Sequence, residues 1–186
     1  MQNIKIGKEN VLNYLIVRLP ILSSVFAGSS KMSSKTLYEI AQNSNQFYIR
    51  LKLAGNPKSC ENTLKILARD NESDIRNEVA QNPNISQDII GVLSKDSCVF
   101  VRARVAENKN CTIKLLEKMS SDPSPIVRIA IARNKKTPVY VLKSLERDND
   151  KKVRDAAKIH LKNCWIIRRL KKFRVNLWTF FFFLYF

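Results

Sequence analysis

The sequence predicts an all-α fold: an α-solenoid of about five 26-residue repeats, each made of two helices. Two observations lead to this prediction. An Ile-Arg or Val-Arg pair recurs every 26 residues, and columns of Ala and Asn follow it in the same register. The arginines are Arg50, Arg76, Arg102, Arg128 and Arg154, the alanines Ala54, Ala80, Ala106 and Ala132, and the asparagines Asn56, Asn82, Asn108 and Asn134. A fixed period in this range is typical of solenoids.

The unit that begins at Ile75 illustrates the first helix of each repeat. Ile75 and Val79 are four residues apart and share one helical face. Ala80 allows a neighbouring helix to pack closely. Asn82 is expected to end the helix, because Asn tolerates the left-handed conformation, and Pro83 cannot continue it.

The second helix is expected to begin near Ser86, near Thr112 or at Thr137-Pro138, since Ser and Thr are good N-caps and Pro suits the first turn. Its apolar residues fall three apart on one face. They are Leu64 and Leu67, Ile90 and Leu93, Leu116 and Met119, and Leu142 and Leu145. Neither helix can bury its apolar stripe alone, so the units must stack.

An aspartate precedes each later arginine by six residues, from the turn after the second helix. The predicted structural ladder consists of Asp70, Arg76, Asp96, Arg102, Asp122, Arg128, Asp148 and Arg154. A carboxylate there can accept from helix N-terminal amides and from the guanidinium group. The alternative is a phosphate-binding row of arginines. The structural interpretation is favoured because each of these arginines comes with its own aspartate.

The chain divides into three segments. Residues 1–48 are expected to form N-terminal capping helices with a degenerate repeat in 23–48, residues 49–162 the repeat array, and residues 163–186 a basic, aromatic tail. Terminal repeats are commonly atypical because they cap the stack. A signal peptide is the alternative for the N-terminus, but Asn13, Arg18 and Pro20 interrupt its apolar run.

The unit from Ile75 to Asp96 resembles the leucine-rich repeat variant family, and its Asp…Val-Arg pattern is shared with HEAT-type helical repeats. The resemblance covers about residues 49–160. It implies a right-handed superhelix in which α-helices alternate with shorter 3₁₀ elements. Some family members carry a cysteine-bound iron–sulfur cluster ahead of the repeats. No cysteine precedes Cys60, so such a cluster is not expected. The third and fourth units depart from the pattern, with Lys109 and Lys135 in place of the proline.

The formal net charge of +17 makes an acidic partner worth considering. Exposed positions of the second helices are expected to form a broken basic stripe, from Lys65, Arg69, Lys95, Lys118, Lys143 and Arg147. Two interpretations remain for these cations. They are either a solvated face or a groove for an acidic protein or nucleic acid.

The tail combines cations with aromatic side chains. Its candidate binding residues are Trp165, Arg168, Arg169, Lys171, Lys172 and Arg174, followed by an apolar run from Val175 to Phe186. That run is too short to span a bilayer. Three interpretations remain: an element that lies in a membrane interface, an apolar cap that folds back, and an extension without selected function.

No catalytic constellation is present in the sequence. Glycine occurs four times, so phosphate-cradling loops are not expected, and no Ser/His/Asp set has a credible base. His160 stands in the Asn column and is expected to have a structural role in a turn. Four dispersed cysteines without a C-x-x-C pair indicate neither zinc nor disulfides.

The sequence therefore predicts a non-enzymatic, cytoplasmic protein-interaction scaffold without a cofactor, a metal or a small-molecule substrate. The partner is expected to be a protein. The alternative is a basic peripheral protein that binds an anionic membrane surface or nucleic acid through the tail and the basic stripe.

Overall fold

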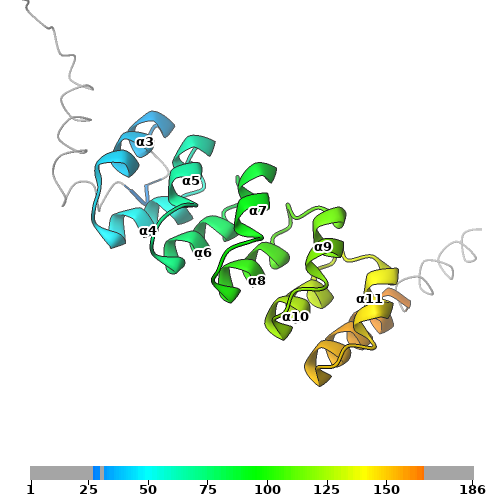
Figure 1. Ribbon diagram of the computed structural model, residues 1–186. Coiled ribbons are helices and arrows are strands. Elements are labelled where there is room, and N and C mark those ends of the chain that lie inside the picture. Colours follow the sequence, from blue (N-terminus) through cyan, green and yellow to red (C-terminus); the bar gives the residue numbers. More distant parts are fainter. Residues whose placement is uncertain (1–26, 30–31, 166–186) are drawn as a thin grey trace, which may run out of the picture.

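The structure, a computed structural model, describes residues 27–29 and 32–165, and all regular secondary structure in these residues is helical. The predicted all-α class is therefore confirmed. The helices stand in pairs along an elongated row (Figure 1). One layer, called the A layer, holds α4 (Phe47–Gly55), α6 (Ser73–Gln81), α8 (Val99–Glu107), α10 (Pro125–Arg133) and a helix over 151–165. The B layer holds α3 (Ser34–Asn43), α5 (Glu61–Leu67), α7 (Gln87–Leu93), α9 (Ile113–Met119) and α11 (Val139–Leu145).

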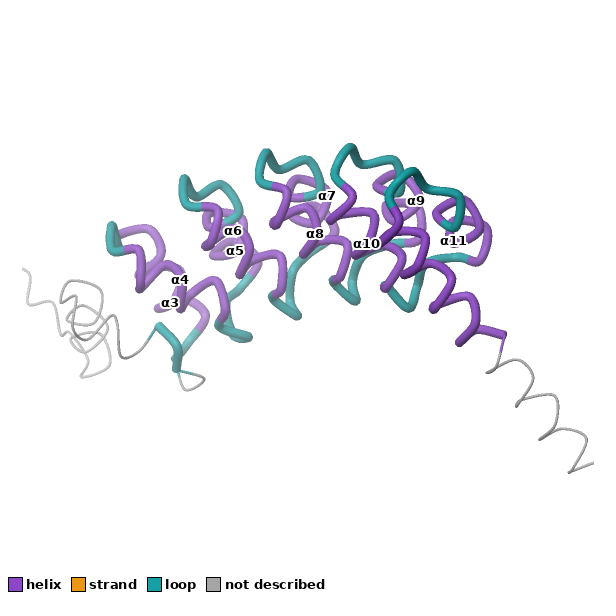
Figure 2. Tube along the Cα trace, turned by 90° about the horizontal axis from the view of Figure 1, so that it is seen from below, coloured by secondary structure: helices purple, strands orange, loops and turns teal. Residues whose placement is uncertain are grey.

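The helices keep the register of the sequence. The A-layer helices begin at residues 47, 73, 99, 125 and 151, and B-layer helices begin at 61, 87, 113 and 139, always 26 residues apart. Loops join the two layers along opposite edges of the row (Figure 2). One edge carries the aspartate turns before the A-layer helices, and the other carries the asparagine turns after them.

The core lies between the two layers. Ile75, Val79 and Ala80 of α6 are fully buried, as are Ile90 of α7 and the equivalent residues of the other units. Successive A-layer helices pack directly on one another, because a fully buried alanine lies at each close approach. From α5 onward the B-layer helices lie further apart from one another, which leaves grooves between them.

The asparagines that end the A-layer helices are not left-handed, contrary to the expectation. Their φ angles lie between −72° and −59° and their ψ angles between 121° and 131°, which is extended backbone. Each amide instead bonds the preceding unit. Asn82 Nδ2 donates to Ala54 O at 2.7 Å, while its Oδ1 accepts from Asn84 N at 2.9 Å. The buried asparagines are therefore inter-unit ties, made by Asn56, Asn82, Asn108 and Asn134.

The B-layer helices differ in two details from the expectation. Ser86 and Thr112 are N-caps as predicted, but the N-cap of α11 is Pro138. Thr137 instead donates from its hydroxyl to Ile131 O at 2.6 Å. The 3₁₀ element implied by the family resemblance does not occur as a separate helix in residues 27–29 and 32–165. The B-layer helices are short α-helices whose chain tightens at the end, as in the bond from Arg69 N to Ile66 O at 3.0 Å.

The two ends of the row are atypical. At the N-terminal end of the described residues α3 stands beside α5, with Leu37 and Ile40 fully buried. At the C-terminal end the helix over 151–165 passes residue 162 without a break, so the expected boundary at 162/163 lies inside a helix. The signal-peptide alternative and the interpretations of residues 166–186 lie outside the described residues. Among the helices that are described, none is both long and apolar enough to cross a bilayer.

Candidate interaction surfaces

Each interior ladder arginine bonds the turn that ends its own unit through a carboxylate and the turn that ends the preceding unit through a carbonyl. Arg76 of α6 donates from Nε to Asp96 Oδ2 at 2.7 Å and from Nη2 to Asp96 Oδ1 at 2.9 Å. Its Nη1 donates to the carbonyl oxygens of Asp70 at 2.7 Å and Asn71 at 2.9 Å. All three guanidinium nitrogens therefore donate to protein acceptors. We call this arrangement a rung.

The aspartate that pairs with each rung arginine differs from the one expected. The side-chain partner of each arginine is the aspartate 20 residues later, and the aspartate six residues earlier contributes its backbone carbonyl. Ion pairs join Arg50 to Asp70, Arg76 to Asp96, Arg102 to Asp122 and Arg128 to Asp148. Sequence reasoning left Arg50 out of the ladder, although its distance to Asp70 along the chain matches that of the other pairs.

Each rung aspartate also accepts a hydrogen bond from the backbone N–H two residues later, just before the next A-layer helix. Asp96 Oδ1 accepts from Cys98 N at 2.8 Å, and Asp122 Oδ1 accepts from Ser124 N at 2.9 Å. Burial alone would raise the pKa of Asp96, but the hydrogen bonds from Arg76 and from Cys98 outweigh it and lower the pKa. The pKa of Asp122 is lowered in the same balance, by Arg102 and Ser124.

The rung arginines have little capacity for an outside anion. The side chains of Arg76, Arg102 and Arg128 expose 13–16% of their surface, and their donors face protein oxygens. This geometry favours the structural interpretation of the ladder over a phosphate-binding row. Arg154 differs from the others, because its Nη1 bonds two carbonyls but no carboxylate among the described residues lies at its other nitrogens.

The six cations of the predicted basic stripe are all exposed, but they do not form one column. Lys65, Lys118 and Lys143 lie on B-layer helices, whereas Arg69, Lys95 and Arg147 lie in the turns that follow such helices. Lys65 and Lys143 share a repeat position that Gly91 and Glu117 occupy in the units between them. Lys65 also pairs with Glu61 at 2.8 Å, and Glu117 accepts from the Tyr140 hydroxyl at 3.2 Å. Acidic side chains thus interrupt the positive field of this face.

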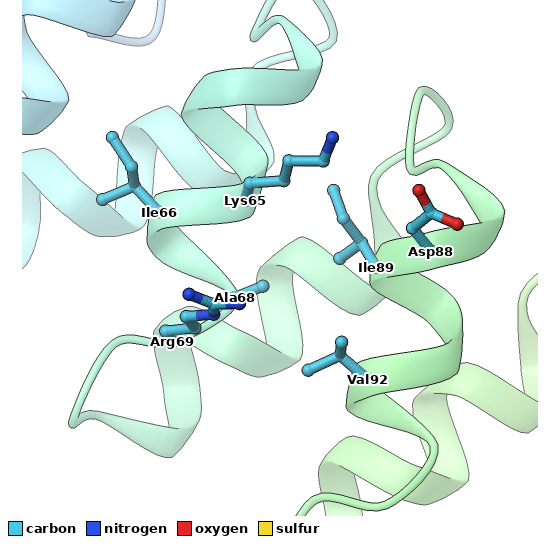
Figure 3. Close-up of a pocket in the computed structure, with 7 residues that line it drawn as sticks. All are labelled: Lys65, Ile66, Ala68, Arg69, Asp88, Ile89 and Val92. Atoms are coloured by element: carbon cyan, nitrogen blue, oxygen red, sulfur yellow. The ribbon is translucent and has the colours of Figure 1, made fainter.

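A groove between α5 and α7 brings two of these cations together with apolar side chains (Figure 3). Its volume is about 490 Å³. Its lining consists of Lys65, Ile66, Ala68, Arg69, Asp88, Ile89 and Val92. Lys65 extends from α5 toward α7, and Ile89 and Val92 project from α7 toward α5. The groove exists because these two B-layer helices are not in close contact.

Some of the apolar side chains that line the groove are exposed. Val92 exposes 52% of its surface and Ile66 exposes 38%, whereas Ile89 and Ala68 are buried beneath them. Lys65, Arg69 and Asp88 supply charges at the rim. An apolar floor with a mostly positive rim is suited to a segment that combines apolar and acidic side chains.

A second hollow of about 630 Å³ lies between the end of α10 and the helix over 151–165. It forms because this helix continues beyond the point at which the earlier A-layer helices end. Ala156, Ile159 and His160 line one side, with Cys164 near the end of the described residues. His160 lies inside the helix and not in a turn, and its Nδ1 is 2.8 Å from Ala132 O, which repeats the asparagine tie.

The thiols and acidic groups show no assembled reaction centre in the described residues. Burial raises the pKa of the Cys111 thiol to about 11. Burial would raise the pKa of Cys60 too, but hydrogen bonds centred on Thr63 lower it. No group of three or more His, Cys, Asp or Glu side chains suited to a metal ion occurs in residues 27–29 and 32–165.

Most of the candidate binding residues of the tail lie outside the described residues. Trp165 is the last described residue and exposes 59% of its surface. The five cations from Arg168 to Arg174 lie outside the described residues. Comparison of the chain with protein-family models, with curated proteins and with solved structures gives no match.

Proposed function

We propose that the protein is a right-handed α-solenoid of about five 26-residue units, of the leucine-rich repeat variant type, and a non-enzymatic cytoplasmic scaffold for protein interaction. The groove between α5 and α7 is the observation that supports this most directly. It offers exposed apolar surface on Ile66 and Val92, with Lys65 and Arg69 beside it. Exposed apolar surface rimmed by polar groups commonly marks a protein contact.

The ligand that fits this groove is a peptide segment with apolar anchors next to acidic residues. The anchors would cover Val92 and Ile66, and the acidic residues would face Lys65 and Arg69. The rungs support this role indirectly, because ion pairs join the turn after α5 to α4 and the turn after α7 to α6, and α4 packs on α6. Such preorganisation reduces the ordering free energy that binding requires.

A random 12-residue peptide library, selected on the full chain, tests this function. We expect the selected peptides to combine apolar and acidic residues. Val92→Glu should weaken their binding by at least about tenfold, because it places a charge in the apolar floor. Ser144→Glu is the matched control, since Ser144 is exposed at the same repeat position on α11. Peptides that bind Val92→Glu and the unaltered chain equally well would contradict the proposal.

The second candidate is a basic peripheral protein that binds nucleic acid or an anionic membrane surface. It is supported by the net charge of +17 and by the unopposed cations of the tail. A 20-nucleotide DNA and vesicles with anionic lipid, titrated with salt, test it, because phosphate contacts weaken steeply as salt rises. Binding that requires residues 163–186 and falls with salt would favour this candidate over the scaffold.

A further inference from the structure

The last described unit of the row departs from the others on the face that interior units use to contact the next unit. In the column of buried alanines, Ala132 is followed 26 residues later by Lys158. The aspartate column ends with Asp148, and position 174 is Arg174. The last unit therefore keeps the rung arginine, Arg154, but loses the small residue that permits close packing and the acid that completes the rung.

Arg154 nevertheless has the pose of an interior rung. Its Nη1 donates to Asp148 O at 2.7 Å and to Asn149 O at 2.8 Å. Arg128 makes the same two bonds, to Asp122 O at 2.7 Å and to Pro123 O at 3.0 Å. At Arg128 the other two nitrogens bind Asp148 at 2.7 and 2.9 Å, whereas at Arg154 no carboxylate of the described residues stands there.

Residues 156–186 hold no acidic side chain for this rung. They contain no Asp or Glu, and Glu9 is the one acidic residue among 1–26, 30–31 and 166–186. A second copy of the chain whose first unit stacked on this end would not supply the missing aspartate either. The residue 26 positions before Asp70 is Ser44.

Further cations surround Arg154 on the same side of its helix. Lys151, Arg154, Lys158 and Lys162 are spaced by three or four residues, so they lie on one helical face. The exposed Asp155 lies beside Lys151 and Lys158 and offsets part of this charge. The three lysines are exposed, and Arg154 is half-buried. We call this set the end face. A preoriented guanidinium group next to lysines is suited to bidentate recognition of a carboxylate with further charge contacts.

We propose that the end face binds an acidic helical segment of a partner protein, whose carboxylate takes the place at Arg154 that an aspartate fills in the preceding rungs. Carboxylate is favoured over phosphate because four arginines of this chain in the same pose each bind a carboxylate. Carboxylates spaced by three or four residues on the partner would match the spacing of the cations. The proposal concerns a surface separate from the groove between α5 and α7 and does not depend on it.

The test uses the full chain and a fluorescein-labelled, alanine-rich helical peptide that carries glutamate at every fourth position. Its glutamine version is the control peptide. Binding is followed by fluorescence anisotropy at several salt concentrations. We expect the glutamate peptide to bind and the glutamine peptide not to bind.

Two substitutions locate the site without removing a core contact. Lys158→Ala restores the residue that the other units have, and Arg154→Lys keeps the charge but removes the bidentate fork. Each should weaken peptide binding by about tenfold, and circular dichroism should show unchanged helix content. Lys114→Ala is the matched control, as Lys114 is an exposed lysine on α9, and it should change the affinity by less than about twofold.

Several results would overturn the proposal. One is the absence of peptide binding. Another is equal weakening by Lys114→Ala, which would indicate general charge attraction. A third is loss of binding on substitution of Arg168 and Arg169 with no effect of Lys158→Ala and Arg154→Lys, which would locate the site on the tail. Tighter binding of a 20-nucleotide DNA that depends on Arg154 and Lys158 would identify the end face as a phosphate site instead.

Discussion

The interior units and the last described unit share a Val-Arg pair but use its arginine differently. In the interior, Arg102 is tied to two carbonyls on one side and to Asp122 on the other, so its charge is neutralised inside the stack. In the last unit, Arg154 keeps the carbonyl bonds but lacks the carboxylate within the described residues. The charge of the same two-residue motif is thus neutralised by a carboxylate in one place and presented as a cation in another. The residue 20 positions after the arginine decides which role the arginine has: it is Asp122 for Arg102 and Arg174 for Arg154.

Acidification should decrease the free energy of unfolding through the interior rungs, because it protonates the aspartates of three rungs at once. The folded-state pKa values of Asp96, Asp122 and Asp148 are lowered, mainly through hydrogen bonds from their arginines against the effect of burial. Groups with a lowered folded pKa stabilise the fold above the unfolded value of about 3.9. This contribution should be lost as the pH falls below that value.

Urea unfolding at pH 7, 5 and 3 measures this prediction. The free energy of unfolding should change little from pH 7 to 5 and fall at pH 3. Asp122→Asn serves as the comparison, since it removes one titrating rung and should make the decrease shallower. A decrease of the same size in both proteins would show that this rung does not contribute.

The asparagine ties should have the largest effect of any single substitution. Asn108→Ala would remove the bond to Ala80 O at 2.6 Å and the bond from Asn110 N at 2.7 Å. A buried carbonyl and a partly buried N–H would lose their partners, which should decrease the free energy of unfolding by about 2–4 kcal/mol. Asn62→Ala, at an exposed position of α5, should change it by less than about 0.5 kcal/mol. Similar values for the two variants would contradict an inter-unit role for Asn108.

Substitution of an interior rung arginine should have the next largest effect on the free energy of unfolding. Arg102→Ala should decrease the free energy of unfolding by about 1–3 kcal/mol, because it leaves the largely buried carboxylate of Asp122 without its ion pair. Urea unfolding of the variant measures this value. A loss well under 1 kcal/mol would mean that the rung is not structural.

Arg154→Ala should have the smallest effect, less than about 1 kcal/mol, because no carboxylate of the described residues is left unpaired. The same unfolding measurement gives the comparison with Arg102→Ala directly. Equal losses at the two positions would remove the distinction between interior and terminal arginines.

Much of the fold followed from the sequence because the repeat signals are local. The spacing of Ile75 and Val79 and the buried Ala80 predict a helix and its packed face, and the structure shows both. The role of Asn82 was wrong, because a side chain at a helix end has two ways to act there. It can adopt a left-handed backbone or bond another unit, and only the position of the neighbouring unit decides between them.

The aspartate that pairs with each rung arginine also could not be predicted from the sequence. Asp96 is close in sequence to Arg102, so the six-residue spacing suggested a side-chain pair. In the structure, the side chain of Asp122, at the end of the same unit, binds Arg102. The side chain of Asp96 instead accepts from Cys98 N and from Arg76. The groove between α5 and α7 could not be predicted either, since it depends on the separation of the B-layer helices.

The central claim is that the side chain of each rung arginine pairs with the aspartate 20 residues later, at the end of its own unit, and bonds only the backbone carbonyl of the aspartate that ends the preceding unit. Double-mutant cycles in urea unfolding test it most directly, one with Arg102→Ala and Asp122→Ala and one with Arg102→Ala and Asp96→Ala. The account predicts a coupling free energy of about 1–3 kcal/mol between Arg102 and Asp122, and a clearly smaller one between Arg102 and Asp96. Stronger coupling between Arg102 and Asp96 would contradict it, because the side-chain ion pair would then be made with the aspartate six residues earlier.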